Sequence, residues 1–294
     1  IDLLQLCSKY EIRFICSNAI KIDKNKNLLY LKDRPPINFD YLSVNIGIKT
    51  NFKDILGADK YALKLKPISE IDSAINKLIK FNERNLSNKI LLIGSGAAGV
   101  EVALALRYRF KRKGIKKNII LLSKSDKILE KLNKISQKVC KNELIKNKIE
   151  IIFNANVNKI DRTYVYYNNS KRIKCKFPIL SVSSCPTDLV INSNLPLTDN
   201  GSIKIDNTLL VNETNNIFAV GDNSEIIGYE REKAGVFAVK QGKFLYKNII
   251  QKFCNKKLYN YYPQKTYLSL IGLTENKALA IKSYFTFKSN YLWS

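Results

Sequence analysis

The segment that most constrains this chain is KILLIGSGAAGVEVALAL, at residues 89–106. An apolar run suited to a buried strand comes first, three glycines follow at GxGxxG spacing, and strong helix formers come last. In such a unit Gly94 permits the tight turn, Gly96 lets the backbone approach a pyrophosphate, and Gly99 lets helix and strand pack closely. The spacing predicts a dinucleotide site, with Ala97 at a helix N-terminus that favours negative charge. A purely structural glycine turn is the alternative.

Length and charge limit the other possibilities. At 294 residues, 45% of them hydrophobic, the chain can form two domains with real cores. The net charge of +25 would suit nucleic acid, but the lysines are spread along the whole chain and no nucleic-acid-binding motif is present, so we expect no such partner. A positive field also attracts phosphate-bearing cofactors and anionic membranes. We expect a cytoplasmic protein, with peripheral contact at the inner face of the membrane as an open alternative.

The chain has six cysteines and no histidine. The cysteines show no CxxC or CxxxxC spacing, so we expect no zinc site, no bound metal and no redox-active cysteine pair. They are typical of scattered small apolar residues in a reducing compartment. The chain begins with Ile1 and contains no methionine, and we interpret it as a fragment or a processed piece.

Hydrophobic periodicity predicts alternating strands and helices. We expect helices at 3–10, from Pro67 through Ile68 to Ile79, and at 135–147; strands at 12–16, 41–46, 118–122, 149–153, 179–183 and 217–220; and antiparallel pairs at 18–32 and around the turn at 168–170. This order indicates an α/β fold in which a βαβ nucleotide domain, carrying an antiparallel flap, is inserted into a second domain.

A second informative segment is TNNIFAVGDNSEI, at residues 214–226. A predicted strand delivers Gly221 and Asp222 at its carboxyl end, which is where ligands bind in open α/β sheets. The aspartate suits the hydroxyl groups of a polyol, and the glycine admits close approach. An ordinary turn is the alternative interpretation.

Three motifs together resemble one family: GSGAAGVE at 94–101, FDYLSVNIG at 39–47 and NNIFAVGD at 215–222. The family is that of the two-dinucleotide-fold flavoproteins, which includes the pyridine nucleotide-disulfide oxidoreductases and the type II NADH dehydrogenases. The resemblance implies a Rossmann-like fold with two dinucleotide-binding domains and the cofactors FAD and NAD(P)H. It implies that Gly47 contacts FAD and that Asp222 binds the ribityl chain.

The segment KAGVFAVKQG, at 233–242, resembles the helix start whose amides face the flavin pyrimidine ring. The residues implied to bind the cofactor there are Gly235, Val236, Phe237 and Gln241. Two catalytic candidates follow from the resemblance. Lys233 would assist the flavin, with a solvated charge as the alternative, and Glu101 would lie near nicotinamide and flavin, with a helix-capping carboxylate as the alternative.

The resemblance also implies a domain plan. We expect the second part of an FAD domain at 1–66, an NAD(P)-binding domain at 67–183, the return of the FAD domain at 184–252, and a small, incomplete α+β C-terminal region at 253–294. The family opens with its own GxGxxG unit for FAD, and this chain has only one such motif. The N-terminal FAD unit is therefore expected to be missing.

The implied function is that of an FAD-dependent NAD(P)H oxidoreductase, which transfers a hydride from nicotinamide to FAD and then reduces a small-molecule acceptor. The resemblance leaves a quinone open as the acceptor. Val236 and Lys240 argue against a quinone, because they stand where quinone-reducing members carry glutamines. One alternative is the front domain of a selenide, water dikinase fusion, because residues 263–283 resemble NADH dehydrogenase-like proteins fused to that enzyme. The other is a regulatory module without turnover, favoured by the missing FAD half and by SVSSC at 181–185.

The end of the second nucleotide strand bears on cofactor choice. NAD-selective sites place an Asp or Glu about 20 residues or more past the glycines to bind the ribose 2′-hydroxyl. Here the strand runs into Ser123 and Lys124, which we predict to contact the cofactor. With no carboxylate there to repel a 2′-phosphate, the sequence favours acceptance of NADPH.

Overall fold

The structure is a computed structural model that describes residues 2–66, 71–85, 88–274 and 276–289. The chain divides into two compact units. Unit 1 consists of residues 1–47 and 186–263, and unit 2 of residues 48–185 and 264–294. A continuous segment of unit 2 is thus inserted between the two segments of unit 1, as the α/β fold with one domain inserted in another predicts.

The limits of the units differ from the expected domain limits. Residues 48–66 belong to unit 2, and the expected C-terminal region is split, since unit 1 extends to 263 and unit 2 resumes at 264. The assignment of FAD to one unit and NAD(P)H to the other stays a prediction.

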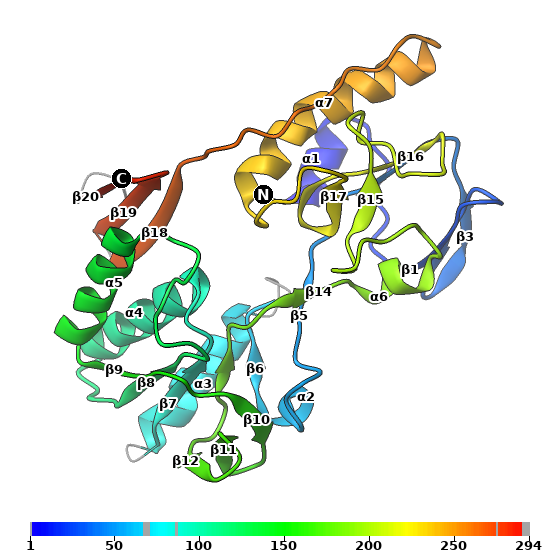
Figure 1. Ribbon diagram of the computed structural model, residues 1–294. Helices are drawn as coiled ribbons and strands as arrows, with labels where there is room; N and C mark the ends of the chain where they lie inside the picture. Colours follow the sequence, from blue (N-terminus) through cyan, green and yellow to red (C-terminus); the bar gives the residue numbers. More distant parts are fainter. Residues whose placement is uncertain (1, 67–70, 86–87, 275, 290–294) are drawn as a thin grey trace. The chain divides into compact units, whose positions relative to one another are not determined.

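Unit 2 is built on a parallel sheet in the order β6-β13-β7-β8-β9 (Figure 1). Its strands are β6 (Leu63–Lys64), β7 (Ile90–Ile93), β8 (Ile119–Leu122), β9 (Ile149–Ile152) and β13 (Ile179–Leu180). Every residue of β7 and β8 is buried, which explains their unbroken apolar runs, because a central parallel strand is covered on both faces. The expected strand at 179–183 ends early, after Leu180.

Three helices belong to this sheet: α3 (Ile71–Arg84), α4 (Ala97–Arg112) and α5 (Lys134–Lys146). Their side chains share one apolar core with the strands, in which Leu78, Leu104 and Leu144 are buried. The expected start of α3 at Pro67 and Ile68 lies outside the described residues.

The predicted flap is present as an antiparallel sheet of β10 (Val157–Ile160), β11 (Tyr164–Tyr167) and β12 (Lys171–Lys174). The smaller elements of unit 2 are the antiparallel pair β5 (Lys49–Thr50) and β14 (Ser184–Cys185), and the one-turn helix α2 (Ala58–Tyr61).

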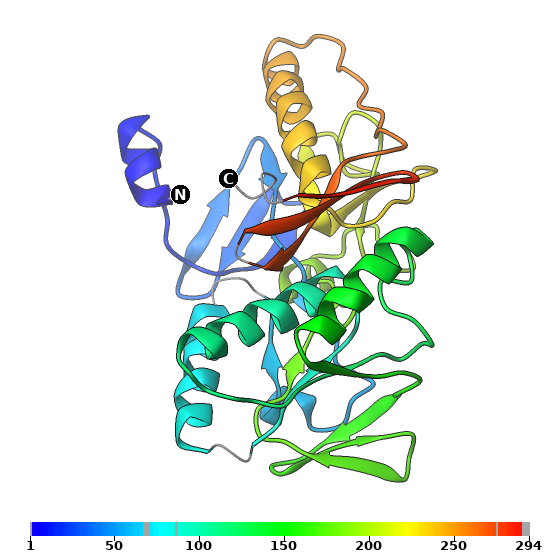
Figure 2. The same cartoon turned by 90° about the vertical axis from the view of Figure 1, so that its left-hand side faces the viewer.

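The C-terminal part of unit 2 is a second antiparallel sheet, formed by β18 (Ser269–Thr274), β19 (Lys277–Lys282) and β20 (Phe285–Ser289). Residues 264–274 and 276–289 thus contain strands without the helix that the α+β prediction included. The sheet lies beside α4 and α5 (Figure 2) and contributes Ile271 and Leu279 to the same core.

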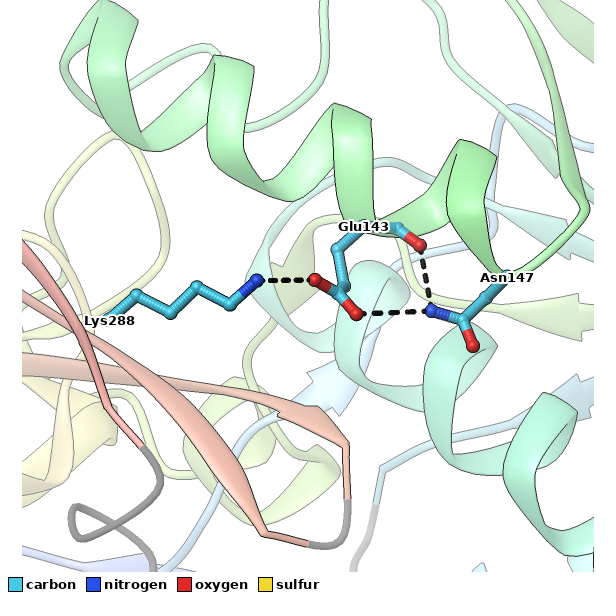
Figure 3. Close-up of polar contacts among 3 residues, drawn as sticks. All are labelled: Glu143, Asn147 and Lys288. Atoms are coloured by element: carbon cyan, nitrogen blue, oxygen red, sulfur yellow. Dashed lines mark hydrogen bonds and ion pairs between the residues drawn. The ribbon is translucent and has the colours of Figure 1, made fainter.

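A polar contact also joins this sheet to α5 (Figure 3). Lys288 Nζ lies 2.6 Å from Glu143 Oε2, and Asn147 Nδ2 donates to Glu143 Oε1 at 3.2 Å. The Glu143 carboxylate is therefore buried with both of its oxygens engaged. Since Lys288 keeps 39% of its side-chain surface exposed, the pair lies at the edge of the interface between helix and sheet.

Unit 1 is assembled from small sheets around its own core. Its strands are β1 (Ala19–Asp23), β2 (Leu28–Leu31) and β3 (Arg34–Asn38), which form an antiparallel sheet; β4 (Leu42–Val44) and β16 (Ile217–Ala219), a parallel pair; and β15 (Ile203–Ile205) and β17 (Ser224–Ile226), another parallel pair. Its helices are α1 (Leu3–Lys9), α6 (Asp188–Asn192), the 3-10 turn η2 (Gly221–Asn223) and α7 (Gly235–Phe253).

Two strand predictions in unit 1 need correction. Residues 12–16 form no strand: Ile12 and Phe14 are exposed and pair with no other strand among the described residues. An apolar run alone does not form a strand without a neighbour to satisfy its backbone. The expected strand at 41–46 is shorter, because only Leu42–Val44 pairs with β16.

Candidate functional site

The glycine turn of unit 2 follows β7 and leads directly into α4, as the sequence predicts. Gly94 has a φ of +109°, and a Cβ there would lie 2.1 Å from Ser181 O. A Cβ at Gly99 would lie 2.0 Å from Gly94 O. Because neither side chain could be accommodated without moving backbone, the fold itself explains these two glycines.

Gly96 is different. Its φ of −71° and ψ of −178° are open to any residue, it is exposed, and a Cβ there would meet no atom within 4 Å. The protein alone does not require glycine here, whereas a ligand lying against the backbone would. The amides of Ala97, Ala98 and Gly99 find no acceptor among the described residues, and α4 has no side-chain cap. Such a helix start suits a phosphate.

The two residues after β8 are placed differently from each other. Ser123 is fully buried, and its Oγ donates to Lys127 O at 2.8 Å. A hydroxyl has one proton, so Ser95 Oγ, 2.7 Å away, must donate to Ser123 Oγ. Ser123 therefore holds the glycine turn through its hydroxyl, and its contact with a cofactor ribose stays a prediction. Lys124 is exposed and free to meet one.

Glu101 lies one turn into α4, and its Oε1 accepts the Gly272 N–H of β18 at 2.7 Å. Burial raises the pKa of this carboxyl group, and the hydrogen bond from Gly272 partly offsets the rise. The carboxylate therefore links the nucleotide helix to the C-terminal sheet. It does not cap the helix, whose N-cap is Gly96. A role beside nicotinamide stays a prediction.

The second turn, in unit 1, is held by side chains. Gly221 has a φ of +81°, and a Cβ there would lie 3.0 Å from Asn45 Oδ1. Its N–H donates to Gln241 Oε1 at 2.8 Å, and Asn223 Nδ2 donates to Ile46 O at 2.9 Å. Between these anchors the carboxylate of Asp222 has no hydrogen-bond partner among the described residues.

Gln241 is completely buried, so its first role is to position the turn. Its Nε2 has no partner among the described residues. Gly47, the predicted FAD contact at the end of the first segment of unit 1, is exposed, and a Cβ there would meet no atom within 4 Å.

At the start of α7, the amides of Gly235 and Val236 differ from that of Phe237. Phe237 is buried and its N–H donates to Ala234 O at 3.0 Å. The amides of Gly235 and Val236 find no acceptor among the described residues, and the helix has no side-chain cap. An electron-rich oxygen would complete this helix start.

Lys233 is tied to the neighbouring strands of unit 1. Its ammonium donates to Ser202 Oγ at 2.9 Å and to Ser224 O at 3.2 Å. Desolvation lowers the pKa of Lys233, and Glu225 opposes that shift. Two of its three protons are thus used within the protein, although much of the side chain is exposed.

The structure adds Arg231, which the sequence interpretation missed. Its guanidinium lies 4.1 Å from the ring centroid of Phe237, in the first turn of α7. Its Nε and Nη2 are buried and have no hydrogen-bond partner among the described residues. In a chain with 50 lysines and arginines, one further basic residue gives no signal by itself.

All six cysteines are free. The described residues contain no group of three or more His, Cys, Asp or Glu side chains placed to hold a metal ion. No helix in the described ranges has the length and apolar character needed to cross a membrane.

Unit 2 carries a glycine turn open to a phosphate, and unit 1 carries a Gly-Asp turn beside a helix start with two amides free of acceptors among the described residues. Such features are typical of nucleotide-binding α/β proteins. Residues 5–242 match the family model for the pyridine nucleotide-disulphide oxidoreductases, and the chain belongs to this family. The family resemblance of the sequence is thereby confirmed.

Relatives and solved structures agree with this assignment. The chain is 25% identical, over 70% of its length, to demethylphylloquinone reductase NdbB of Synechocystis sp., of which it covers 52%. It is 24% identical, over 96% of its length, to a protein of Dictyostelium discoideum named "Probable NADH dehydrogenase", of which it covers 68%. The chain thus spans about half to two thirds of the length of these relatives.

Among solved structures, the sulfide:quinone oxidoreductase of Aquifex aeolicus superposes with a TM-score of 0.79 at 19% identity, covering 97% of this chain and 73% of that one. NDH2 of Plasmodium falciparum in complex with NADH gives a TM-score of 0.77 at 17% identity, covering 95% and 78%. These likenesses confirm the two-dinucleotide-domain flavoprotein fold.

Proposed function

We propose that this chain is part of an FAD-dependent NAD(P)H oxidoreductase. The observation that carries the proposal is the glycine turn of unit 2, where Gly96 is open to a ligand and three amides at the start of α4 have no acceptor in the part of the chain that the structure describes. These groups would bind the pyrophosphate of NAD(P)H. Membership of the family and the names of the relatives support the same activity.

Unit 1 supplies groups that fit FAD. The carboxylate of Asp222, which has no hydrogen-bond partner among the described residues, would accept hydrogen bonds from the ribityl hydroxyls, while Gln241 and Asn223 hold the turn that presents it. The amides of Gly235 and Val236 would donate to the pyrimidine edge of the flavin and stabilise the charge that reduction places there. FAD, when bound, supplies the atom that accepts the hydride from nicotinamide.

We further propose a quinone-type electron acceptor, supported by the relative named as a demethylphylloquinone reductase. Peripheral contact with a membrane and a cytoplasmic location stay predictions. The selenide, water dikinase fusion gains no support from the relatives reported above. A nucleotide-binding module without turnover is the remaining alternative, and spectroscopy separates it from an enzyme.

The test uses the complete gene product, purified without added flavin. We expect the absorbance of bound oxidised flavin, and its loss when NADH or NADPH is added without oxygen. A Gly96→Val variant should keep the flavin spectrum and lose its reduction at substrate concentrations that reduce the wild type, whereas Gly242→Ala, where a Cβ meets open space, should behave like wild type. A protein without flavin, or flavin that neither nucleotide reduces, would overturn the proposal.

A further inference from the structure

The strongest unexplained feature outside the predicted site is the guanidinium of Arg231. Its Nε and Nη2 are buried, and neither has an acceptor among the described residues. Leaving a charged donor buried without a partner costs more than leaving a neutral one, so such atoms in a folded protein call for an explanation. An acceptor that is not part of the protein would provide it.

The surroundings indicate where that acceptor would lie. Arg231 stacks on the ring of Phe237, which belongs to the first turn of α7, with the ring centroid 4.1 Å from its Cζ. The same turn carries the two amides, of Gly235 and Val236, for which the described residues also provide no acceptor. Unpartnered backbone and side-chain donors therefore gather at one helix start. Stacking on an aromatic ring fixes the plane of the guanidinium, so that its donors are held in one direction.

Ionisable groups near Arg231 affect its charge. Desolvation lowers the pKa of Arg231, while Tyr261, Asp222 and Glu225 oppose that shift. Asp222 is the residue proposed to hold the ribityl chain, so Arg231 lies within electrostatic reach of the group that would position the flavin. The Glu225 carboxylate is buried and accepts from Thr198 Oγ1 at 3.3 Å.

We propose that Arg231 donates a hydrogen bond to the pyrimidine edge of the bound flavin and binds the reduced cofactor more tightly than the oxidised one. The inference rests on the proposed function, because it requires FAD at the start of α7. Reduction adds negative charge to the flavin pyrimidine, and a fixed guanidinium beside it stabilises that charge preferentially.

The same donors could instead meet the pyrophosphate of FAD, since guanidinium binds both kinds of oxygen. The two possibilities differ in a measurable way. A phosphate keeps its charge when the flavin is reduced, so an arginine bound to it would hold both redox states equally. The position of Arg231 on Phe237, beside the free amides of α7, favours the pyrimidine edge.

The experiment compares wild type with Arg231→Gln, Arg231→Lys and the control Arg34→Gln, which changes an exposed arginine of β3. In the complete protein, the Kd of oxidised FAD is measured by titration of the apoprotein and the two-electron midpoint potential by spectroelectrochemistry. Thermal unfolding of each apoprotein reports folding.

We expect Arg231→Gln to lose about tenfold of the preference for reduced FAD, which lowers the midpoint potential by about 30 mV. Arg231→Lys should recover part of this shift, because it keeps the charge and loses the planar fork. Arg34→Gln should leave the potential unchanged. If Arg231→Gln does not fold, the shift in Arg231→Lys decides.

Two results would overturn the inference alone: an unchanged potential, or equal weakening of oxidised and reduced FAD, which would assign Arg231 to the pyrophosphate. A wild-type protein that binds no FAD would overturn the proposed function, and this inference with it.

Discussion

The two glycine-containing turns that we propose to bind the cofactors are stabilised differently. In unit 2 the turn takes its shape from glycines five residues apart, Gly94 and Gly99, whose missing side chains let the backbone pack closely. In unit 1 the turn at Gly221 depends on Gln241, twenty residues further along the chain, and on Asn223, which donates to Ile46 O in the other segment of the unit. The first turn is stabilised by local backbone packing, and the second by tertiary contacts.

This difference decides what each turn can tolerate. In unit 2, packing fixes the outer glycines while Gly96 remains open, so folding and binding should respond to different substitutions. In unit 1, a buried amide holds the turn, so removing one side chain should affect both the fold and the ligand. The predictions below test this contrast.

The largest expected effect is on folding. Gly99→Ala would place a Cβ 2.0 Å from Gly94 O and force α4 away from the turn. We expect a loss of about 3 kcal/mol in the free energy of unfolding, measured by urea denaturation. The control Gly242→Ala, at an open helical position, should gain about 0.5–1 kcal/mol. Equal stability of the two variants would show that packing does not require Gly99.

The next effect is on binding. Gly96→Val should weaken binding of the nicotinamide nucleotide about a hundredfold, near 2.7 kcal/mol, because the side chain fills the space of the pyrophosphate. The melting temperature should stay close to that of wild type, since the backbone at Gly96 accepts any residue. Calorimetric titration measures the affinity. An affinity within about twofold of wild type would favour a structural turn.

The contrast also explains which parts could be predicted from the sequence. A turn that depends on local backbone packing is encoded by adjacent residues. The strand, the glycine spacing and the helix of unit 2 could therefore all be recognised in the sequence. Buried strands such as β7 and β8 were equally clear, since burial on both faces requires continuous apolar runs.

The features that the sequence did not reveal depend on tertiary contacts. The predicted strand at 12–16 has no neighbouring strand among the described residues, and no local pattern reveals that. The hydroxyl of Ser123 is engaged by Lys127 O and Ser95 Oγ, which the sequence did not indicate, and its contact with the cofactor stays a prediction. Arg231 becomes conspicuous only when its donors are seen to be buried without acceptors.

The third prediction concerns the turn of unit 1, which tertiary contacts stabilise. Gln241→Leu would leave the buried Gly221 N–H without its acceptor, which should cost about 2 kcal/mol of stability. Binding of FAD should weaken as well, because the turn presents Asp222. The matched control is Gln251→Leu in the same helix, for which we expect little change. Denaturation and FAD titration measure the two effects. If Gln241→Leu left both the stability and the FAD affinity unchanged, the turn of unit 1 would also be stabilised by local backbone packing.

The fourth prediction concerns the ion pair that joins α5 to the C-terminal sheet (Figure 3). Burial alone would raise the pKa of Glu143, but the hydrogen bond and charge of Lys288, together with the charges of Lys277 and Lys146, outweigh it, and the pKa lies below its usual value. Lys288→Met should cost about 1.5 kcal/mol at neutral pH, a value reduced from that of a fully buried pair because Lys288 is partly exposed.

The sign of the pH dependence follows from the lowered pKa. The stabilisation is fully present above the pKa of Glu143 in the unfolded chain, about 4.3, and is lost as the pH falls through its lower folded value. The gap in stability between wild type and Lys288→Met should therefore close on acidification. Lys282→Met, on the exposed end of β19, is the control. A gap that persists or widens in acid would mean that packing, rather than charge, accounts for the loss.

The smallest effect concerns the choice between NADH and NADPH, which we expect to depend on a single exposed side chain near the glycine turn of unit 2. With Ser123 buried, Lys124 is the residue left to meet a 2′-phosphate, and it is a flexible point charge without the fork of an arginine. We expect kcat/KM for the two nucleotides to differ by less than about tenfold, or 1.4 kcal/mol. Lys124→Glu should shift the ratio toward NADH by about tenfold, whereas Lys138→Glu, an equal change of charge on α5, should leave it unchanged. A wild-type preference for NADH above about a hundredfold, near 2.7 kcal/mol, would contradict acceptance of NADPH. It would also mean that a group beyond this turn selects the ribose, so that the nucleotide site of unit 2, like the turn of unit 1, depends on distant residues.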